Sequence, residues 1–506
     1  MTARSLKDLT SGLVSVPTDI PPEVRVNDVT LDSRAVSPGA LFLACRGGTR
    51  HGLEFAEQAA ARGARAVLYE ADGHARPSLQ SEIFVAGIPH LGRHVGTIAD
   101  RFFGSPAQAL TVAGITGTNG KTTCAWLLAQ ALQICNRRAA FMGTIGFGVP
   151  PTLTPTERTT SDAVGVHRQF AALRQLGAEC VSMEVSSHAI EQHRVAAVRF
   201  ETAAFTNLTR DHLDYHGTME AYGAAKARLF TWPQLAHRVI NVDDPFGAQL
   251  AAQRSAARLV ITSRGVGGTS AWRPHAEIVC ARSVARESGG LRIAVESSWG
   301  SGELTAPLIG DFNVDNVLTV LAVLLVWNVP LSHALAALAR AKPPSGRMET
   351  FGGSGVLPLG IVDYAHTPDG LTKALAAARA HCRGHLRVVF GCGGDRDPGK
   401  RPMMGRVASE MADEAILTDD NPRTEDPAKI VADILAGFPG PELPLVEHDR
   451  AVAIRTALAR STPEDVVLVA GKGHEDYQIY GTARRPFSDQ SIVAEALGLA
   501  SLGGRA

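Results

Sequence analysis

The chain has 506 residues, of which 50 are Lys or Arg and 50 are Asp or Glu, so its formal net charge is zero at neutral pH. This balance argues against nucleic acid or an anionic membrane surface as the main partner. The length exceeds what one hydrophobic core supports and predicts about two to four domains.

Membrane insertion and secretion are not expected. The opening MTARSLKDL lacks the apolar core of a signal peptide, and the longest apolar stretch, 317–327, is too short to span a bilayer. The seven cysteines are scattered and show no CxxC spacing, which is typical of free thiols in a reducing compartment. We therefore expect a cytoplasmic protein.

The first part of the chain predicts a small α/β domain. Four short apolar runs, VTL, ALFLAC, AVLYE and IFVAG, lie between residues 24 and 87, and the helical segment FAEQAAARG separates the second from the third. The polar loops at 30–34 and 46–51 are its candidate binding segments, although plain surface turns have the same composition.

The stretch 110–123, LTVAGITGTNGKTT, predicts a strand, a glycine turn and a helix that together bind phosphate. Gly117 and Gly120 allow backbone N–H groups to approach phosphate oxygens, Lys121 reaches the β- and γ-phosphates, and the Thr122 hydroxyl binds Mg²⁺. Ile115 stands where the strict P-loop pattern has glycine, so this turn is a variant.

The following segment, to about residue 340, alternates strands and helices and predicts a mostly parallel, doubly wound sheet. Ligands bind beyond the carboxyl ends of such strands, where Glu184 and His212 fall among other polar residues, and a carboxylate and an imidazole from neighbouring strand ends can hold a divalent ion beside a triphosphate. His212 and His216 are alternatively a zinc pair, without a further ligand motif to support it. We expect an antiparallel appendage at 264–305 and a buried helix at 314–327.

A third, Rossmann-like α/β domain is predicted after the Lys-Pro-Pro hinge at 342–344. Its apolar runs at 360–368, 387–397, 414–423 and 466–476 each end in polar, glycine- or proline-bearing sequence. Arg347, Arg396 and Arg423 lie in such loops and suit the capture of carboxylate or phosphate, although a solvated arginine is as common for any one of them.

Nine motifs occur in one order along the chain: GITGTNGKTT, MEVSSHAIEQHR, TNLTRDHLDYHG, GDFNVDN, SGRME, DYAHTP, GCGGDRDPGKRP, DNPRTEDP and GKGHEDYQ. Together they resemble the Mur ligase family along almost the whole chain. The resemblance is strongest to the type that adds the third residue of the peptidoglycan stem peptide. It implies a UDP-binding domain at 1–102, an ATP-binding domain at 103–341 and an amino-acid-binding domain at 342–506.

The resemblance also implies the reaction. ATP would phosphorylate the γ-carboxylate of the D-glutamyl residue of UDP-N-acetylmuramoyl-L-Ala-D-Glu, and an amine would attack the acyl phosphate to give an amide, ADP and phosphate. Catalysis would come from positioning and charge neutralisation. The expected cofactors are ATP and Mg²⁺, the partners are small molecules, and the expected state is a monomer.

Residue roles follow from the resemblance position by position. Lys121, Lys226 and His212 are implied as catalytic, and Lys226 is implied to be carbamylated and to bind metal with Thr122, Glu184 and His212. The implied ATP-binding residues are Thr116, Gly117, Thr118, Asn119, Gly120, Lys121, Thr122, Asn313, Arg347, Asp363 and His366. The implied UDP-muramoyl-dipeptide contacts are Leu31, Ser33, Gly48, Thr49, Arg50, Arg158, Thr159, Thr160, Ser186, Gln192 and Arg194.

The stretch 420–423, DNPR, resembles the family's signature for meso-diaminopimelate. The implied contacts are Arg396, Asp420, Asn421, Pro422, Arg423, Gly471 and Glu475. Diaminopimelate differs from lysine by a distal carboxylate, which Arg396 and Arg423 would bind. Lysine would leave these arginines buried and unpaired, so we expect discrimination against it.

Two other functions stay open at this point. A folylpolyglutamate synthetase-like ligase would share the ATPase and C-terminal domains, without the domain before the phosphate loop and without DNPR. A nucleotide-driven switch would need neither Lys226 nor the second polar rim.

Overall fold

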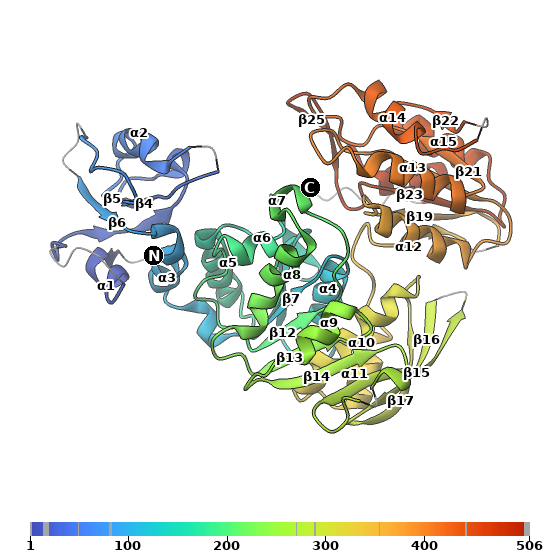
Figure 1. Ribbon diagram of the computed structural model, residues 1–506, viewed down its shortest axis with the longest axis horizontal. Helices are drawn as coiled ribbons and strands as arrows, with labels where there is room; N and C mark the ends of the chain where they lie inside the picture. Colours follow the sequence, from blue (N-terminus) through green and yellow to red (C-terminus); the bar gives the residue numbers. More distant parts are fainter. Residues whose placement is uncertain are drawn as a thin grey trace.

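The computed structural model describes residues 3–13, 20–48, 50–79, 83–269, 271–287, 290–353, 355–440 and 443–499. Within them the chain forms three large sheets, of four, eleven and six strands, and two small two-stranded ones. Each large sheet is built from one continuous part of the chain, and the three succeed one another from the N-terminus to the C-terminus (Figure 1).

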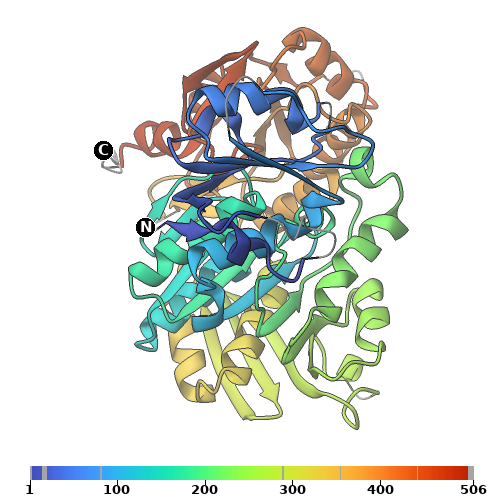
Figure 2. The ribbon, with the colours of Figure 1, turned by 90° about the vertical axis from the view of Figure 1, so that its left-hand side faces the viewer.

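The N-terminal sheet is parallel throughout, with strand order β3-β4-β5-β6. Its strands are β3 (Asp28–Thr30), β4 (Ala40–Ala44), β5 (Ala66–Glu70) and β6 (Phe84–Ile88). Helices α1 (Leu6–Thr10), α2 (Ala56–Ala61) and α3 (Leu91–Phe103) accompany it, and β1 (Arg4–Ser5) pairs with β2 (Arg25–Val26). The turned view in Figure 2 places this small unit in front of the remainder of the molecule.

The central sheet has the order β10-β9-β8-β11-β7-β12-β13-β14-β15-β16-β17. From β8 to β15 all neighbouring strands are parallel, whereas both ends of the sheet are antiparallel. The strands are β7 (Thr111–Thr116), β8 (Ala139–Gly143), β9 (Gly146–Val149), β10 (Thr152–Thr154), β11 (Cys180–Glu184), β12 (Thr202–Phe205), β13 (His237–Asn241), β14 (Arg258–Ser263), β15 (Glu277–Glu287), β16 (Gly290–Ser297) and β17 (Gly300–Ala306).

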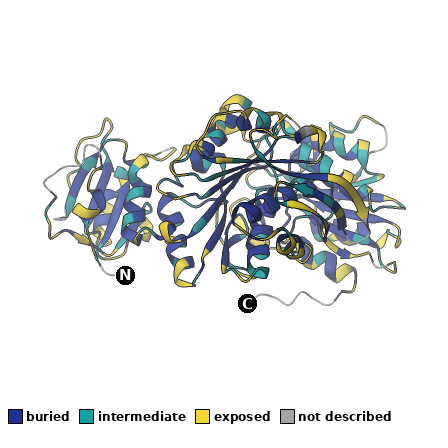
Figure 3. Ribbon diagram, turned by 90° about the horizontal axis from the view of Figure 1, so that it is seen from below, coloured by how far each residue is buried: buried dark blue, intermediate teal, exposed yellow. Residues whose placement is uncertain are grey.

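Helices cover both faces of this sheet and give it two separate cores. Its helices are α4 (Lys121–Ile134), α5 (Ala163–Gln175), α6 (Ser187–Glu191), α7 (Leu213–His216), α8 (Met219–Ala227), α9 (Pro245–Ala251), α10 (Phe312–Val326) and α11 (Leu331–Leu338). Helix α10 is apolar on all sides after its first turn, and it is correspondingly buried between the sheet and α4. Figure 3 shows the central strands coloured as buried and the exposed residues on outer helix faces and loops.

The C-terminal sheet has the order β18-β19-β23-β20-β21-β22 and is parallel except for its first strand. Its strands are β18 (Glu349–Gly352), β19 (Leu359–Asp363), β20 (Leu386–Phe390), β21 (Glu414–Leu417), β22 (Leu445–Val446) and β23 (Val466–Ala470). Its helices are α12 (Pro368–Arg379), α13 (Lys400–Met411), α14 (Pro427–Leu435), α15 (Arg450–Ala459) and α16 (Asp489–Ala496), and β24 (Tyr477–Tyr480) pairs with β25 (Ala483–Pro486).

The architecture confirms the expected class of three α/β units with mostly parallel sheets. The segment 264–305 does contain the antiparallel strands β15 to β17, and the predicted buried helix is α10. The sequence did not indicate β8 to β10 or the β24–β25 hairpin, because their short runs lack a clear period. Among the described residues, none of the helices has the length and apolar content that a membrane crossing requires.

Candidate active site

The phosphate loop joins β7 to α4 and depends on two glycines with positive φ, +149° at Gly117 and +86° at Gly120. A Cβ at Gly117 would collide with the Thr206 hydroxyl, and one at Gly120 would collide with the Asn316 side-chain oxygen. The loop is therefore restricted to glycine at both positions by backbone conformation and by space.

The loop that follows β12 holds the phosphate loop in shape. The Thr118 N–H donates to the Asn207 carbonyl at 2.8 Å, and the Asn119 N–H donates to the Asn207 side chain at 3.0 Å. The Thr206 hydroxyl donates to the Asn119 carbonyl at 2.6 Å. Two neighbouring strand ends thus form one rigid polar rim.

Two lysines meet at this loop. Lys121 Nζ donates to the carbonyls of Gly117 and Thr118 at 2.9 and 2.8 Å, and Lys226 Nζ, from α8, donates to the Gly117 carbonyl at 2.8 Å. Lys226 is 1% exposed and lies over the ring of Tyr222. Burial, followed by repulsion from Lys121, holds the pKa of Lys226 well below its usual value.

Glu184 ends β11 beside the first turn of α4 and is fully buried. Its carboxylate accepts hydrogen bonds from the Thr122 hydroxyl at 2.9 Å, from the Thr144 N–H at 2.8 Å and from the Thr144 hydroxyl at 3.2 Å. A buried carboxylate and a threonine hydroxyl at the phosphate loop are oxygen ligands of the kind that Mg²⁺ prefers. These residues therefore fit the expected metal.

Arg347, from the C-terminal unit, also contacts the Thr122 hydroxyl. Arg347 Nη2 donates to the Thr122 hydroxyl at 3.3 Å, while Arg347 Nε is buried without a hydrogen-bond partner. The Arg347 guanidinium also lies over the Tyr364 ring, 4.3 Å from its centroid. An unpartnered buried N–H on a cation beside the phosphate loop fits an anionic ligand such as a nucleotide phosphate.

The other residues expected at ATP lie around this junction. Asp363 accepts from the Met348 N–H at 2.8 Å, His366 Nδ1 lies 2.8 Å from the Tyr364 carbonyl, and burial lowers the pKa of His366. Asn313, in the first turn of α10, donates to the Ile309 carbonyl at 2.7 Å.

His212 lies at the start of α7 in a left-handed conformation, with its side chain 43% exposed. Burial lowers the pKa of His212, with Lys121, Lys226 and His366 acting in the same direction and Asp211 opposing them. These neighbours place His212 within electrostatic range of the two lysines. No described hydrogen bond or ion pair joins it to Glu184.

The zinc-pair alternative loses support because both nitrogens of His216 are engaged. His216 Nε2 lies 2.9 Å from the Ser187 hydroxyl, and Nδ1 lies 3.2 Å from a Glu191 oxygen.

The residues expected to contact the muramoyl dipeptide come from the segment before α5 and the segment after β11, and they meet at the end of β11. The Thr160 hydroxyl donates to the Glu184 carbonyl at 2.9 Å and accepts from the Ser186 N–H at 3.3 Å. Arg194 donates to the Thr160 carbonyl at 3.1 Å and to Gln192 Oε1 at 3.0 Å. The Thr159 hydroxyl accepts from Thr144 at 3.1 Å, and Arg158 is near enough to lower the pKa of Arg194, after burial as the main cause.

No described hydrogen bond joins the expected uridine contacts of the N-terminal unit to the residues expected to contact the muramoyl dipeptide. The Ser33 hydroxyl donates to Gln58 Oε1 at 2.7 Å, and Leu31 packs against the core of the small sheet. Arg50 pairs with Glu54 at 2.8 Å, near Gly48, whereas Thr49 lies outside the described residues.

The group expected to bind diaminopimelate lies at the carboxyl ends of β21 and β23. Glu475 accepts from Asn421 Nδ2 at 2.8 Å and from Lys472 Nζ at 3.0 Å. Lys472 is fully buried and also lies 3.4 Å from Asp420, and the Gly471 N–H donates to the Asp363 carbonyl at 3.1 Å. The residues expected to bind diaminopimelate are thus connected through Gly471 to Asp363, which is one of the residues expected to bind ATP.

Arg396 and Arg423 both lie near the glycine turn after β20. Arg423, which follows Pro422, donates to the Gly394 carbonyl at 2.7 Å, and Arg396 donates to the Asp395 carbonyl at 3.1 Å. Neither forms an ion pair with a described carboxylate. The expectation that both are buried is wrong: Arg396 is exposed and Arg423 half-buried, because the turn lies at the open rim of the sheet.

Three contacting residues were missed from the sequence. Thr144 binds Glu184, Lys472 binds Glu475, and Asp369 accepts from Asn119 Nδ2 at 3.0 Å across the central and C-terminal units. Thr144 follows β8 at its carboxyl end, which is the signal that would have indicated it. Lys472 was visible only as part of the GKGHED motif, and Asp369 gave no signal of its own.

Family models match along the chain: the Mur ligase family catalytic domain over residues 25–101, the Mur ligase middle domain over 115–324, and the Mur ligase glutamate ligase domain over 346–473. The matched segments coincide with the three large sheets. The chain belongs to the Mur ligase family.

Similar proteins narrow the comparison within that family. A UDP-N-acetylmuramoyl-L-alanyl-D-glutamate--2,6-diaminopimelate ligase of Ectopseudomonas mendocina is 48% identical over 474 residues, which is 94% of this chain and 95% of that protein. A solved structure with the same ligase name is 33% identical, covers 98% of this chain and 99% of its own, and has a TM-score of 0.69. A Mycobacterium tuberculosis folylpolyglutamate synthase shares the fold at 16% identity, over 75% of this chain and 92% of its own, with a TM-score of 0.58.

Proposed function

We propose that this chain is an ATP-dependent ligase that adds meso-diaminopimelate to UDP-N-acetylmuramoyl-L-Ala-D-Glu in the synthesis of peptidoglycan precursors. The substrates are those named by the similar ligases. The site accounts for the class of reaction, because a phosphate loop, the buried carboxylate of Glu184 and the guanidinium of Arg347 are the kinds of group that phosphoryl transfer to a carboxylate requires.

One observation carries the proposal: Glu184 of the central sheet and Arg347 of the C-terminal unit contact the same Thr122 hydroxyl. A carboxylate that can bind a divalent cation and an arginine that can bind phosphate therefore meet at Thr122, although they come from two separate units. A nucleotide bound there would contact both units, so its binding would be linked to their relative position.

The roles of the chain's own residues follow from this arrangement. Lys121 and the N–H groups of 117–120 hold the phosphates and neutralise their charge, and Thr122 and Glu184 offer oxygens to a divalent cation. A Mg²⁺ ion held by these oxygens would neutralise negative charge on the phosphates and so reduce their repulsion of the attacking carboxylate. We place His212 as a further ligand and Asn313, Asp363 and His366 at the nucleotide.

Lys226 is assigned the carbamylated position. Its lowered pKa favours the neutral amine, whose lone pair attacks CO₂ and releases a proton to give the carbamate. The product is an anion beside Lys121, whereas the protonated amine would be a buried cation repelled by Lys121. Modification therefore removes an electrostatic conflict and supplies an oxygen ligand.

In this proposal separate groups of residues bind the muramoyl dipeptide, the uridine part, ATP and diaminopimelate. The set at 158–160 and 186–194 binds the muramoyl dipeptide, and the N-terminal unit, 1–102, binds the uridine part through Leu31, Ser33 and the loop 48–50. The unit 103–341 binds ATP. The unit 342–506 binds diaminopimelate, with Arg396 and Arg423 on its distal carboxylate and Glu475 on its ammonium group.

The proposed reaction has two steps, and neither forms a covalent bond to the enzyme. The γ-carboxylate oxygen of the D-glutamyl residue attacks the terminal phosphorus of ATP and ADP leaves. The neutral amine of diaminopimelate attacks the acyl carbon, and phosphate leaves with that oxygen. The chain contributes alignment and cationic side chains at the developing negative charge.

Neither alternative is favoured by a specific observation. A folylpolyglutamate-type ligase leaves about a quarter of this chain unmatched, since that synthase covers 75% of it. A simple nucleotide switch does not explain why a buried lysine of α8 contacts the phosphate loop.

We further propose a monomer that works in the cytoplasm. ATP is available there, and all seven cysteines are free thiols. Light scattering during size-exclusion chromatography tests the monomer at the mass of 53.4 kDa.

The deciding experiment measures phosphate release from ATP and Mg²⁺ with UDP-N-acetylmuramoyl-L-Ala-D-Glu, comparing meso-diaminopimelate with L-lysine, and weighs the product by mass spectrometry. Turnover with diaminopimelate and a product heavier by one diaminopimelyl residue supports the proposal. Turnover with lysine alone would keep the ligase and overturn its specificity. Phosphate release that ignores both peptide and amino acid would favour the switch.

A further inference from the structure

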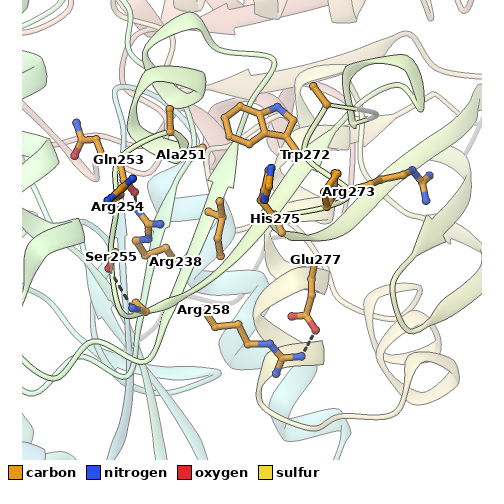
Figure 4. A pocket seen from close by; sticks show the side chains of 16 residues that line it. Arg238, Ala251, Gln253, Arg254, Ser255, Arg258, Trp272, Arg273, His275 and Glu277 are labelled. Atoms are coloured by element: carbon orange, nitrogen blue, oxygen red, sulfur yellow. Dashed lines mark hydrogen bonds and ion pairs between the residues drawn. The ribbon is translucent and has the colours of Figure 1, made fainter.

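A cavity of about 790 Å³ lies in the central unit away from the phosphate loop (Figure 4). It is lined by β13, by the end of α9 with the residues leading into β14, and by the residues leading into β15. Strands β12 to β15 run parallel to β7, so this is the amino edge of the sheet, whereas the phosphate loop follows the carboxyl edge. No residue assigned above to a substrate or metal lines it.

The cavity is strongly basic. Its lining contains four arginines and one carboxylate, namely Arg238, Arg254, Arg258, Arg273 and Glu277. Glu277 pairs with Arg258, and Arg273 lies 2.6 Å from Glu296. Arg238 and Arg254 have no ion-pair partner among the described residues, so two cations remain without counter-charge.

Arg238 is the more unusual of the two because it is only 4% exposed. Its Nη1 donates to the carbonyls of Gln253 at 3.0 Å and Leu250 at 3.5 Å, at the end of α9, while its Nε is buried without a partner. Burial lowers the pKa of Arg238, which reflects the missing counter-charge. A buried guanidinium in this state is stabilised by an anion.

The opposite wall, residues 271–277, carries the aromatic ring of Trp272 together with Arg273, His275 and Glu277. Trp272 is half-buried and packs against the core of this face of the sheet. In Figure 4, Arg238 and Arg254 lie on the left of the cavity, and Trp272 and His275 lie to their right. A ligand in this space would meet cations on one side and an indole ring on the other.

We propose that this cavity is a binding site for a small organic anion with a planar ring, whose carboxylate or phosphate is held by Arg238 and Arg254 and whose ring packs against Trp272. Charge-assisted hydrogen bonds to guanidinium groups select the anion, and the aromatic wall selects the ring. The site is separate from the proposed reaction and does not depend on it.

The test titrates the intact chain with phenyl phosphate and with benzoate and follows tryptophan fluorescence. We expect saturable quenching by at least one of them, the stronger binder identifying the anionic group, and loss of this signal in Trp272→Phe. Arg254→Ala removes an exposed side chain and weakens binding by roughly 10-fold or more. Arg340→Ala, at an exposed arginine of the same unit outside the cavity, leaves binding unchanged.

Four results would overturn the proposal. These are no saturable binding of either anion, quenching that persists in Trp272→Phe, binding that Arg254→Ala leaves intact, and equal binding of the neutral benzyl alcohol. Inorganic phosphate that binds as tightly as phenyl phosphate would remove the ring from the proposal, because the aromatic wall would then contribute nothing.

Discussion

Burial changes the chemistry of an amine, and it lowers the pKa of Lys226. Lys226 sits on an amphipathic helix, where an isolated lysine is usually solvated. Here it is 1% exposed and donates to the phosphate loop. Only its resemblance to a family position indicated a role, since helix periodicity gives no reason to bury a charged residue.

Replacement of Lys226 tests that role directly. We expect Lys226→Ala to lower kcat for ligation by about 100-fold or more, because it removes a charged group from the centre of phosphoryl transfer. Nucleotide binding, measured by calorimetry, should persist because Lys121 and the loop backbone remain. Lys429→Ala, at an exposed lysine of α14, is the matched control. A Lys226→Ala enzyme with normal kcat would contradict the assignment.

In the proposed function, specificity for the amino acid depends on Arg423. We expect Arg423→Ala to raise KM for diaminopimelate by roughly 10- to 100-fold, the usual effect of losing a charged hydrogen-bond partner. KM for ATP should stay within about twofold, because the described hydrogen bonds of Arg423 are to the C-terminal unit and none is to the phosphate loop. Since Arg423 is half-buried, the effect should fall in the lower part of the range.

The control for this change is Arg383→Ala, which removes an exposed arginine of the same unit. Equal KM values for diaminopimelate in the Arg423→Ala and control enzymes would refute the carboxylate-binding role. The comparison also separates a specific contact from the general loss of one positive charge.

At the scale of elements, the phosphate loop is a part of the fold that could be predicted from the sequence. A strand, a glycine turn and a helix were readable from β-branched residues, glycine spacing and helix-forming residues, and β7 and α4 confirm them. The sequence did not reveal that Asn316 of α10 packs against Gly120, because that contact joins segments far apart in the chain.

Gly120→Ala should therefore damage both the loop and the fold around it. A φ of +86° costs an alanine roughly 1–2 kcal/mol, and displacement of Asn316 adds to this. We expect a lower midpoint in urea unfolding and weaker ADP binding. Gly267→Ala is the control, since its Cβ would meet no atom within 4 Å and its φ is not positive. Equal midpoints for the two variants would contradict this account.

Three strands of the C-terminal sheet are tied at one edge by Arg387 of β20. It lies 2.8 Å from Asp465, which precedes β23, and 3.0 Å from Glu414 of β21. Burial alone would raise the pKa of Asp465, but hydrogen bonds from the Thr462 and His385 N–H groups and from Arg387 outweigh it and hold this pKa at about 2.

This depressed pKa predicts a pH dependence of stability. The carboxylate contributes fully above its unfolded value of 3.8, and the contribution is lost as the pH falls through about 2. We expect Asp465→Asn to lower the free energy of unfolding by about 2 kcal/mol at pH 7 and by much less at pH 2. Urea unfolding at several pH values measures this, and a difference independent of pH would contradict it.

At the scale of the whole molecule, the sequence predicted three units but not how they meet. The strand ends that carry Glu184, His366 and Arg423 were each predictable within one sheet. The contact of Arg347 with Thr122 and that of Asp369 with Asn119 depend on the relative placement of two units. No local pattern of polarity or spacing encodes that placement, which explains why Asp369 was missed.

Asp369 offers a way to test the link between the two units. Its Oδ2 accepts from Asn119 at 3.0 Å and from Thr209 at 3.4 Å in the central unit, and it pairs with Lys373 on its own helix at 2.9 Å. Such a partly exposed contact contributes about 1 kcal/mol, or roughly a fivefold change in the ratio of joined to separated arrangements. We expect Asp369→Ala to increase the radius of gyration in X-ray scattering without nucleotide. Lys373→Ala, which keeps the contacts to Asn119 and Thr209, should leave it unchanged, and equal radii for both variants would show that this carboxylate does not hold the units together.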